Sequence, residues 1–156
     1  MVLIAILFFI RPMPLACQEV AKIGPPTPLR TTDLLNFSTG WYFRLGEYQK
    51  PGGGQALGTF EQGPGWDQVV LPHSFNAQNT FVPVRGYYRG IGWYRKHFSL
   101  TPDQVSRKVF LEFAAAYAVA DLWVNEFHVG QYMGGYTGFS ADVTDLVKAG
   151  DNLVAV

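Results

Sequence analysis

The sequence predicts an all-β fold, an antiparallel β-sandwich. Two observations favour it: 17 Gly and 10 Pro stand among 15% aromatic residues, and short alternating segments recur at regular spacing. A third is the scarcity of helical periodicity, because a 3.6-residue period occurs only in the short stretch 143–148, which Gly150 closes. At 156 residues the chain has the length of about one domain.

Residues 1–17 are predicted to be a signal peptide, so we expect an exported protein. Residues 2–10 (VLIAILFFI) form an apolar run that is too short to span a bilayer but suits the core of such a signal. Ala16 precedes the single cysteine, Cys17, as in the processing site of a bacterial lipoprotein. Pro14 argues against lipidation, so a lipoprotein, a soluble exported product and a misplaced start codon all stay open.

Residues 18–32 contain three prolines and no apolar period, and we expect a Pro-rich arm there. The sandwich is expected over residues 33–156. Its predicted strands are Trp41–Leu45, 69–71, 91–100, 109–113, Ala118–Val124, 127–132 and 152–156, with a Gly/Pro-rich loop at 46–65. The strands on either side of Asn125-Glu126 should form a hairpin, since only two residues separate them. The chain stops inside the last strand, from which we expect a sandwich truncated at that point.

Composition and spacing argue against several kinds of site. Twelve basic and twelve acidic residues cancel, so no net field draws the chain to nucleic acid. One cysteine allows no internal disulfide, and His73, His97 and His128 have no metal-like spacing. The glycines 52–54 lack the Lys-Ser/Thr of a phosphate loop. We therefore expect no cofactor and no metal.

Six sequence blocks indicate the protein family that the chain resembles. They are WDQVVLPHSFN (66–76), YYRGIGWYRKHF (87–98), VFLEF (109–113), ADLWVN (120–125), VGQYMGGYTGF (129–139) and DVTDLVKAGDNLVAV (142–156). In this order and spacing they resemble the N-terminal sugar-binding domain of glycoside hydrolase family 2, which includes β-galactosidases, β-glucuronidases and β-mannosidases. LLNFSTGWYFRLG (34–46) is similar to the first strand of that domain. The resemblance implies a galactose-binding-like jelly roll.

The resemblance also implies what the domain does. It would be the non-catalytic part of a retaining exo-β-glycosidase, with a β-galactosidase-like activity as the first expectation. The catalytic barrel of the same polypeptide and a β-linked glycoside would be its partners, and a homo-oligomer of the full enzyme stays open. The loop 72–89 would reach the active site, which makes His73, Asn76 and Arg85 the candidate substrate-binding residues. A free-standing carbohydrate-binding module is the alternative.

No catalytic residue is expected in this chain. In the barrel of the family the acid/base glutamate follows an asparagine, and Asn125-Glu126 has the same dipeptide. However, it stands between two alternating strands, and no second carboxylate is placed to serve as the nucleophile. Retaining glycosidases need two carboxyl groups about 5 Å apart. Glu126 also replaces the glycine that the family usually has in this turn, which should strain the turn or lengthen it.

Overall fold

The structure of the chain is a computed structural model that describes residues 6–12, 23–26, 33–46, 65–75 and 88–156. The backbone alone is described for β1 (Ile6–Pro12) and for the first two residues of β3 (Asp33–Asn36). Asn76 and Arg85, two of the three predicted substrate-binding residues, lie outside these ranges, as does most of the predicted loop 46–65.

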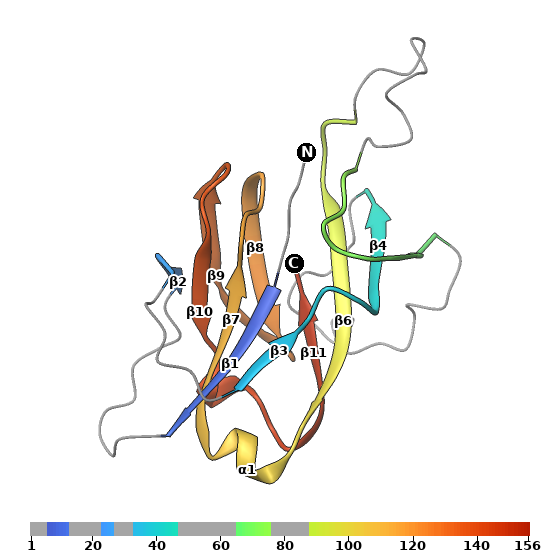
Figure 1. Cartoon of the computed structure of the whole chain (residues 1–156). Helices are drawn as coiled ribbons and strands as arrows, with labels where there is room; N and C mark the ends of the chain where they lie inside the picture. Colours follow the sequence, from blue (N-terminus) through green and yellow to red (C-terminus); the bar gives the residue numbers. More distant parts are fainter. Residues whose placement is uncertain (1–5, 13–22, 27–32, 47–64, 76–87) are drawn as a thin grey trace.

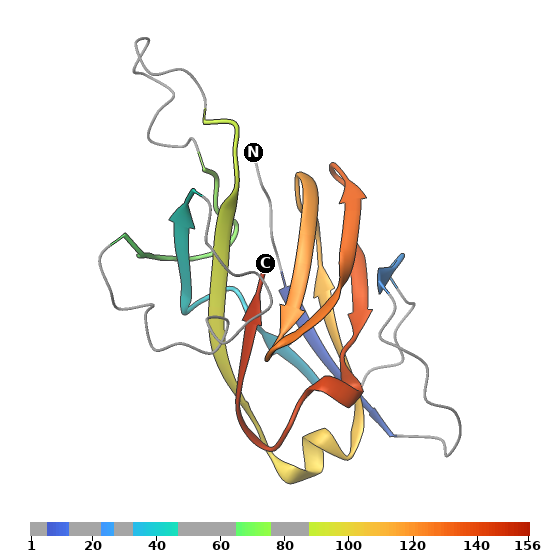
Figure 2. The ribbon, with the colours of Figure 1, turned by 180° about the vertical axis from the view of Figure 1, so that it is seen from behind.

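Two antiparallel sheets make up the domain, as the sequence predicts (Figures 1 and 2). One has the strand order β2-β10-β7-β1-β3, and the other has the order β5-β4-β6-β11-β8-β9. The remaining strands are β2 (Ile23–Gly24), β4 (Trp41–Leu45), β5 (Asp67–Val69), β6 (Gly92–Leu100), β7 (Arg107–Phe113), β8 (Ala118–Val124), β9 (Phe127–Gly134), β10 (Phe139–Asp142) and β11 (Gly150–Ala155).

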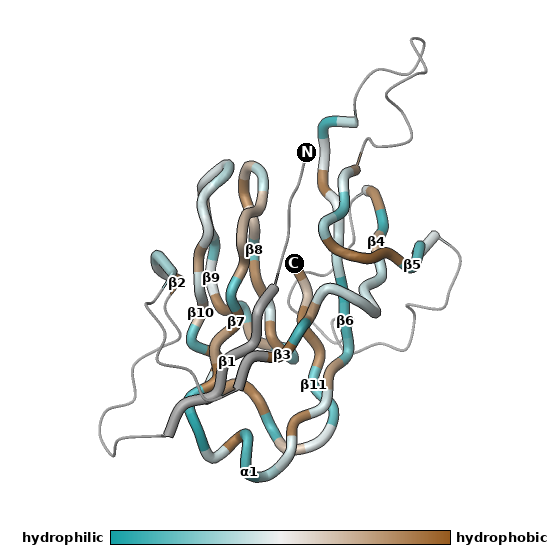
Figure 3. The backbone as a smooth tube through the Cα atoms, viewed as in Figure 1, coloured by the Kyte–Doolittle hydropathy of each residue, from teal (hydrophilic) through white to brown (hydrophobic). Residues whose placement is uncertain are grey.

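The core lies between the sheets and consists of alternate residues of the strands. Along β6 the buried cluster takes Tyr94, Phe98 and Leu100, and along β7 it takes Val109, Leu111 and Phe113. These sets are the faces that the period-2 alternation predicts, because successive side chains of a strand point to opposite sides. In Figure 3 β6 is mostly hydrophilic along its length, whereas β8 is mostly hydrophobic.

Several short elements differ from the prediction or were missed, and the strands β3 and β10 are among those missed. The strand expected at 69–71 is β5, two residues earlier, and Leu71 is buried beyond its end. The expected helical turn is a 3-10 helix at Thr144–Leu146. The helix α1 (Pro102–Val105) was not predicted, although its capping box is visible in the sequence: Gln104 N–H donates to Thr101 Oγ1 at 3.2 Å, and Thr101 N–H to Gln104 Oε1 at 2.8 Å.

Two N-terminal segments contain strands of the five-stranded sheet that the sequence did not predict. Residues 6–10 of the apolar run assigned to a signal peptide lie in β1, which pairs with β7 and β3. The predicted arm contributes β2, which pairs with β10. A short apolar run rich in β-branched and aromatic residues suits a buried strand as well as a signal core, so periodicity alone does not separate the two. Removal of a leader and export remain predictions. No helix in the described ranges is long and apolar enough to cross a membrane.

The predicted hairpin is β8–β9, with Asn125 and Glu126 as its two-residue turn. Asn125 has a φ of 55° and is the only residue other than glycine with a positive φ among those described. The expected lengthening of the turn is therefore wrong. Within the turn only Asn125 has the left-handed backbone conformation, and asparagine tolerates it. Glu126 does not have a positive φ.

Candidate functional site

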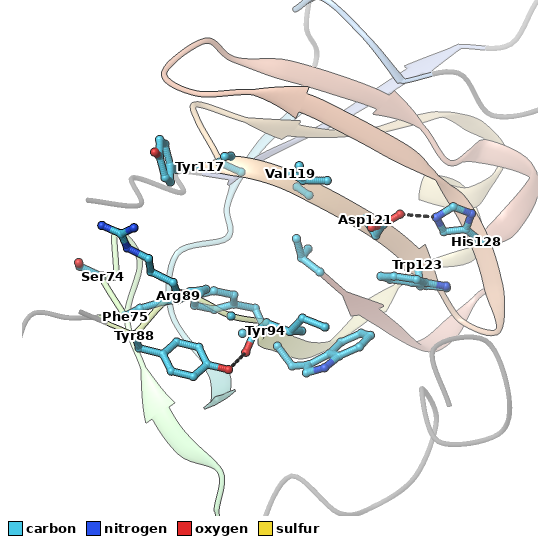
Figure 4. A pocket seen from close by; sticks show the side chains of 18 residues that line it. Ser74, Phe75, Tyr88, Arg89, Tyr94, Tyr117, Val119, Asp121, Trp123 and His128 are labelled. Carbon is cyan, nitrogen blue, oxygen red and sulfur yellow. Dashed lines mark hydrogen bonds and ion pairs between the residues drawn. The ribbon is translucent and has the colours of Figure 1, made fainter. Parts of the chain in front are cut away.

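A groove with a volume of about 1160 Å³ lies between β6 and β8. One wall is the start of β8 with the residues just before it, and the other combines Ser74 and Phe75 with residues 88–92 (Figure 4). Val156 lies at its floor, after the end of β11. The groove thus occupies the part of the six-stranded sheet in which β11 does not separate β6 from β8.

Aromatic rings line the outer side of the groove. Trp93 of β6 and Trp123 of β8 lie with their ring centroids 5.3 Å apart, and both are buried, together with Ala155. The ring of His128 contacts Trp123 at 4.9 Å, and its Nε2 lies 3.0 Å from Asp121 Oδ1. This side of the sheet therefore offers flat apolar surfaces beside one carboxylate.

The opposite wall comes from the loops that flank β5 and β6. Phe75 packs on Phe43 with a centroid distance of 5.0 Å, which ties this loop to the core. The Tyr88 hydroxyl donates to the carbonyl oxygen of Ile91 at 3.0 Å, so the ring folds back over the entry to β6. Arg89 is exposed at the rim (Figure 4). A hydroxyl, a guanidinium and several rings meet here, a combination that suits a polar ligand with an apolar face.

His73, the described member of the predicted substrate-binding set, lies behind this wall and not in it. Its Nδ1 is 2.9 Å from the Tyr94 hydroxyl oxygen, and its ring packs on Phe43 at 4.7 Å. Burial lowers the pKa of His73, and the nearby Asp67 carboxylate offsets part of that effect. His73 therefore anchors the loop to the core, and its part in binding a substrate stays a prediction.

The described residues hold no centre for metal chemistry. No group of three or more His, Cys, Asp or Glu side chains in the described ranges could bind a metal ion. Glu126 is exposed on the β8–β9 turn, at the end of β8 opposite to Ala118.

Residues 59–156, more than half of the chain, match the family model described as "Glycosyl hydrolases family 2, sugar binding domain". The chain belongs to glycoside hydrolase family 2. Among curated relatives of this family, the Bacteroides fragilis β-glucuronidase is 39% identical over 84 residues, which are 54% of this chain and 12% of that protein. The Thermoanaerobacter pseudethanolicus β-galactosidase is 37% identical over 93 residues, 58% of this chain and 12% of that protein. The chain thus spans about an eighth of their length.

Solved structures of the family agree with the fold. A putative β-galactosidase from Bacteroides fragilis matches with a TM-score of 0.63 and 25% identity, over 88% of this chain and 18% of that one. This family 2 chain is therefore an antiparallel sandwich of the kind found in such enzymes, as the resemblance implied.

Sequence reasoning did not identify the residues that line the groove. Three of these residues, Trp93, Asp121 and Trp123, lie on the side of their strands that faces away from the main core cluster. The alternation along the strands could have indicated the groove. Strand positions that face outward are normally polar, and two of these outward positions, 93 and 123, are tryptophan. That β6 and β8 come to lie on either side of β11 depends on the strand order, which the pattern does not give.

Proposed function

We propose that the chain is the non-catalytic sugar-binding domain of a retaining exo-β-glycosidase whose substrate is a β-glucuronide. The match to the sugar-binding domain of family 2 over residues 59–156 carries this proposal. The described residues add a groove with rings and polar groups at its rim.

Two observations favour a β-glucuronide over the β-galactoside that the sequence first suggested. Several of the matching curated proteins bear the name β-glucuronidase, for example those of Bacteroides fragilis and rat. In addition, the exposed guanidinium of Arg89 at the rim matches the carboxylate of a glucuronate, which a neutral galactose lacks. A β-galactoside is the second candidate substrate, because one of the relatives is a β-galactosidase.

A domain exchange tests the proposal. The matched segment of the Bacteroides fragilis β-glucuronidase would be replaced by residues 59–156 of this chain, and hydrolysis of p-nitrophenyl β-glucuronide and β-galactoside would be measured. We expect an active chimera that prefers the glucuronide, and no hydrolysis by the isolated chain. A folded but inactive chimera, or hydrolysis by the isolated chain, would contradict the proposal.

Arg89→Ala in the chimera tests the specificity separately. We expect the KM for the glucuronide to rise about tenfold, because a charge-assisted contact is worth about 1.5–3 kcal/mol, while the low rate on the galactoside stays unchanged. Arg89→Lys should restore part of the affinity. Binding of free oligosaccharides by the isolated chain, followed by tryptophan fluorescence, would instead support an independent carbohydrate-binding module.

A further inference from the structure

Two tyrosines lie side by side at the end of the β8–β9 hairpin that is opposite to its turn. Tyr117 directly precedes β8 and Tyr136 comes just after β9, and the pairing of Ala118 with Gly134 brings the two together. Their ring centroids are 5.9 Å apart, with the planes at 42°. Tyr117 is 56% exposed and Tyr136 is 76% exposed. These two residues form an open aromatic surface, which we call the tyrosine platform.

The hydroxyl groups of the platform have no part in holding the fold. Those of Tyr88, Tyr94 and Tyr132 each have a hydrogen-bond partner within the protein. By contrast, neither platform hydroxyl has a partner among the described residues. Large apolar groups that gather on a surface mark a site of interaction, and tyrosine offers a rigid contact area with a polar tip. The platform therefore has the properties of a binding surface.

The surface beside the platform is apolar and uncharged. Val119 and Met133 face each other across the two strands and are 54% and 75% exposed. Gly135 has no side chain to cover the Tyr117 ring, since an added Cβ would lie 4.0 Å from Cδ2 of that ring. The first carboxylate along β8, that of Asp121, already has two hydrogen-bonded neighbours. A ligand of this surface therefore needs an apolar face and no net charge.

The size of the surface favours a sugar over a protein. Four exposed side chains present on the order of a few hundred Å². A stable protein interface buries about 800 Å² on each partner. A β-glucopyranose fits the smaller area, because all its ring substituents are equatorial and its axial C–H groups form a flat apolar face. Such C–H groups pack on the negative face of an aromatic ring, and the sugar hydroxyls around them can bond to the tyrosine hydroxyls.

We propose that the tyrosine platform binds one gluco-configured, β-linked sugar unit of an oligosaccharide, stacked by its C–H face on Tyr117 and Tyr136. Figure 4 shows Tyr117 on the wall of the groove opposite to Arg89. The platform and Arg89 therefore contact different units, and the ligand is a sugar chain. This inference does not depend on the proposed glucuronide or on its hydrolysis, because stacking needs neither a carboxylate nor a catalytic centre.

The experiment is a titration of the isotope-labelled chain with methyl β-cellobioside, followed by the amide shifts in NMR spectra. Tyr117→Ala and Tyr136→Ala each remove one ring of the platform. Phe127→Ala is the matched control, because Phe127 lies at the other end of the same hairpin and is 58% exposed. A double variant with Tyr117→Phe and Tyr136→Phe retains both rings without their hydroxyls. The denaturant midpoint of every variant verifies that it folds.

We expect the sugar to shift the amides of Val119, Met133 and Gly135 in the unsubstituted chain. The Kd should rise about tenfold in each of the two Tyr→Ala variants, because a stacked ring is lost. Phe127→Ala should bind like the unsubstituted chain. The double Tyr→Phe variant should lose only about two- to fivefold in affinity, since the rings remain and only hydrogen bonds are removed.

Three results would overturn the proposal. The first is the absence of amide shifts at the solubility limit of the sugar, and the second is an equal loss of affinity in Phe127→Ala. The third is a shift of the same amides with protein concentration alone, which would assign the platform to a second copy of the chain.

Tryptophan fluorescence separates the platform from the groove. The platform contains no tryptophan, so the fluorescence should stay constant while the amides shift. A change in fluorescence without these shifts would place the sugar at Trp93 and Trp123 in the groove, which contradicts the proposal and supports the independent carbohydrate-binding module. An inactive chimera would contradict the proposed function but not the platform, because this titration involves no hydrolysis.

Discussion

The Nδ1 atom of His73 lies 2.9 Å from the phenolic oxygen of Tyr94, which joins the loop after β5 to the beginning of β6. Tyr94 is 2% exposed, and its ring also contacts Trp41 and Phe43. The two backbone bonds to Val156 start from the same residue. Tyr94 therefore links the loop, the core and the floor of the groove.

The first prediction concerns the pH dependence of stability. Burial lowers the pKa of His73 in the folded protein below its ordinary value of 6.5. As the pH falls through 6.5, the unfolded chain takes up a proton before the folded one does, so stability decreases until the folded protein is protonated too. In His73→Gln this loss should be absent. Denaturant unfolding of both proteins from pH 8 to pH 5 measures it.

Tyr94→Phe serves as the control for that experiment. It removes the hydroxyl but leaves His73 half-buried, so the decrease of stability below pH 6.5 should persist. The variant should lose about 1 kcal/mol at pH 8, because a half-buried ring nitrogen is left without its partner. If His73→Gln shows the same pH dependence as the unsubstituted chain, His73 is not its source.

The second prediction concerns Asn152, which is 1% exposed and is the centre of a polar network. Its Nδ2 donates to the carbonyl oxygens of Lys148 at 2.7 Å and Gly150 at 3.0 Å, and its Oδ1 accepts from Asn125 Nδ2 at 3.1 Å. Asn152→Leu leaves these groups unsatisfied, so we expect a loss of about 2–4 kcal/mol in the free energy of unfolding.

Asp151→Asn is the matched control for Asn152, since it alters the neighbouring residue on the solvent side of β11. Its partner is His97, at 2.9 Å, and the side chains of His97 and Asp151 are 37% and 64% exposed. An exposed pair of this kind contributes about 0–1 kcal/mol. Chemical denaturation distinguishes the two variants. A loss in Asp151→Asn as large as that in Asn152→Leu would show that the network does not stabilise this end of the sheet.

The sequence predicted the sandwich and its inner faces because both follow from local alternation. Val109, Leu111 and Phe113 all lie in the core, as their spacing requires. The groove could not be predicted in this way, because it depends on β11 lying between β6 and β8, strands distant from it in the chain. The anchoring of His73 was missed for a related reason: its partner Tyr94 is 21 positions away.

The third prediction concerns Gly92, which lies against the ring of Phe75. An added Cβ at Gly92 would lie 2.3 Å from an atom of the Phe75 side chain. Gly92→Ala should therefore cost about 1–3 kcal/mol by overpacking. Its cost should shrink in a Phe75→Ala background, and a double-mutant cycle gives the coupling between the two sites. Additive effects would mean that Phe75 does not fill the space at Gly92.

The fourth prediction concerns Phe139 of β10, whose ring lies between those of Phe113 and Tyr132. The centroid distances are 4.5 Å to Phe113, with the planes 5° apart, and 4.1 Å to Tyr132, with the planes 19° apart. Phe113 belongs to the five-stranded sheet and Tyr132 to the six-stranded sheet, so Phe139 connects the two layers. Phe139→Ala should lower the free energy of unfolding by about 3–5 kcal/mol.

Phe127→Ala is the control for Phe139, because it removes the same side chain from a position that is 58% exposed. It should change stability by less than about 0.5 kcal/mol. Phe139→Leu separates burial from stacking: it retains most of the buried apolar area but loses both ring contacts. A loss of about 1–2 kcal/mol in that variant would assign this share to the stacked rings and to imperfect filling of their space. If Phe139→Ala and Phe127→Ala lower the midpoint equally, the layers are not held together at Phe139.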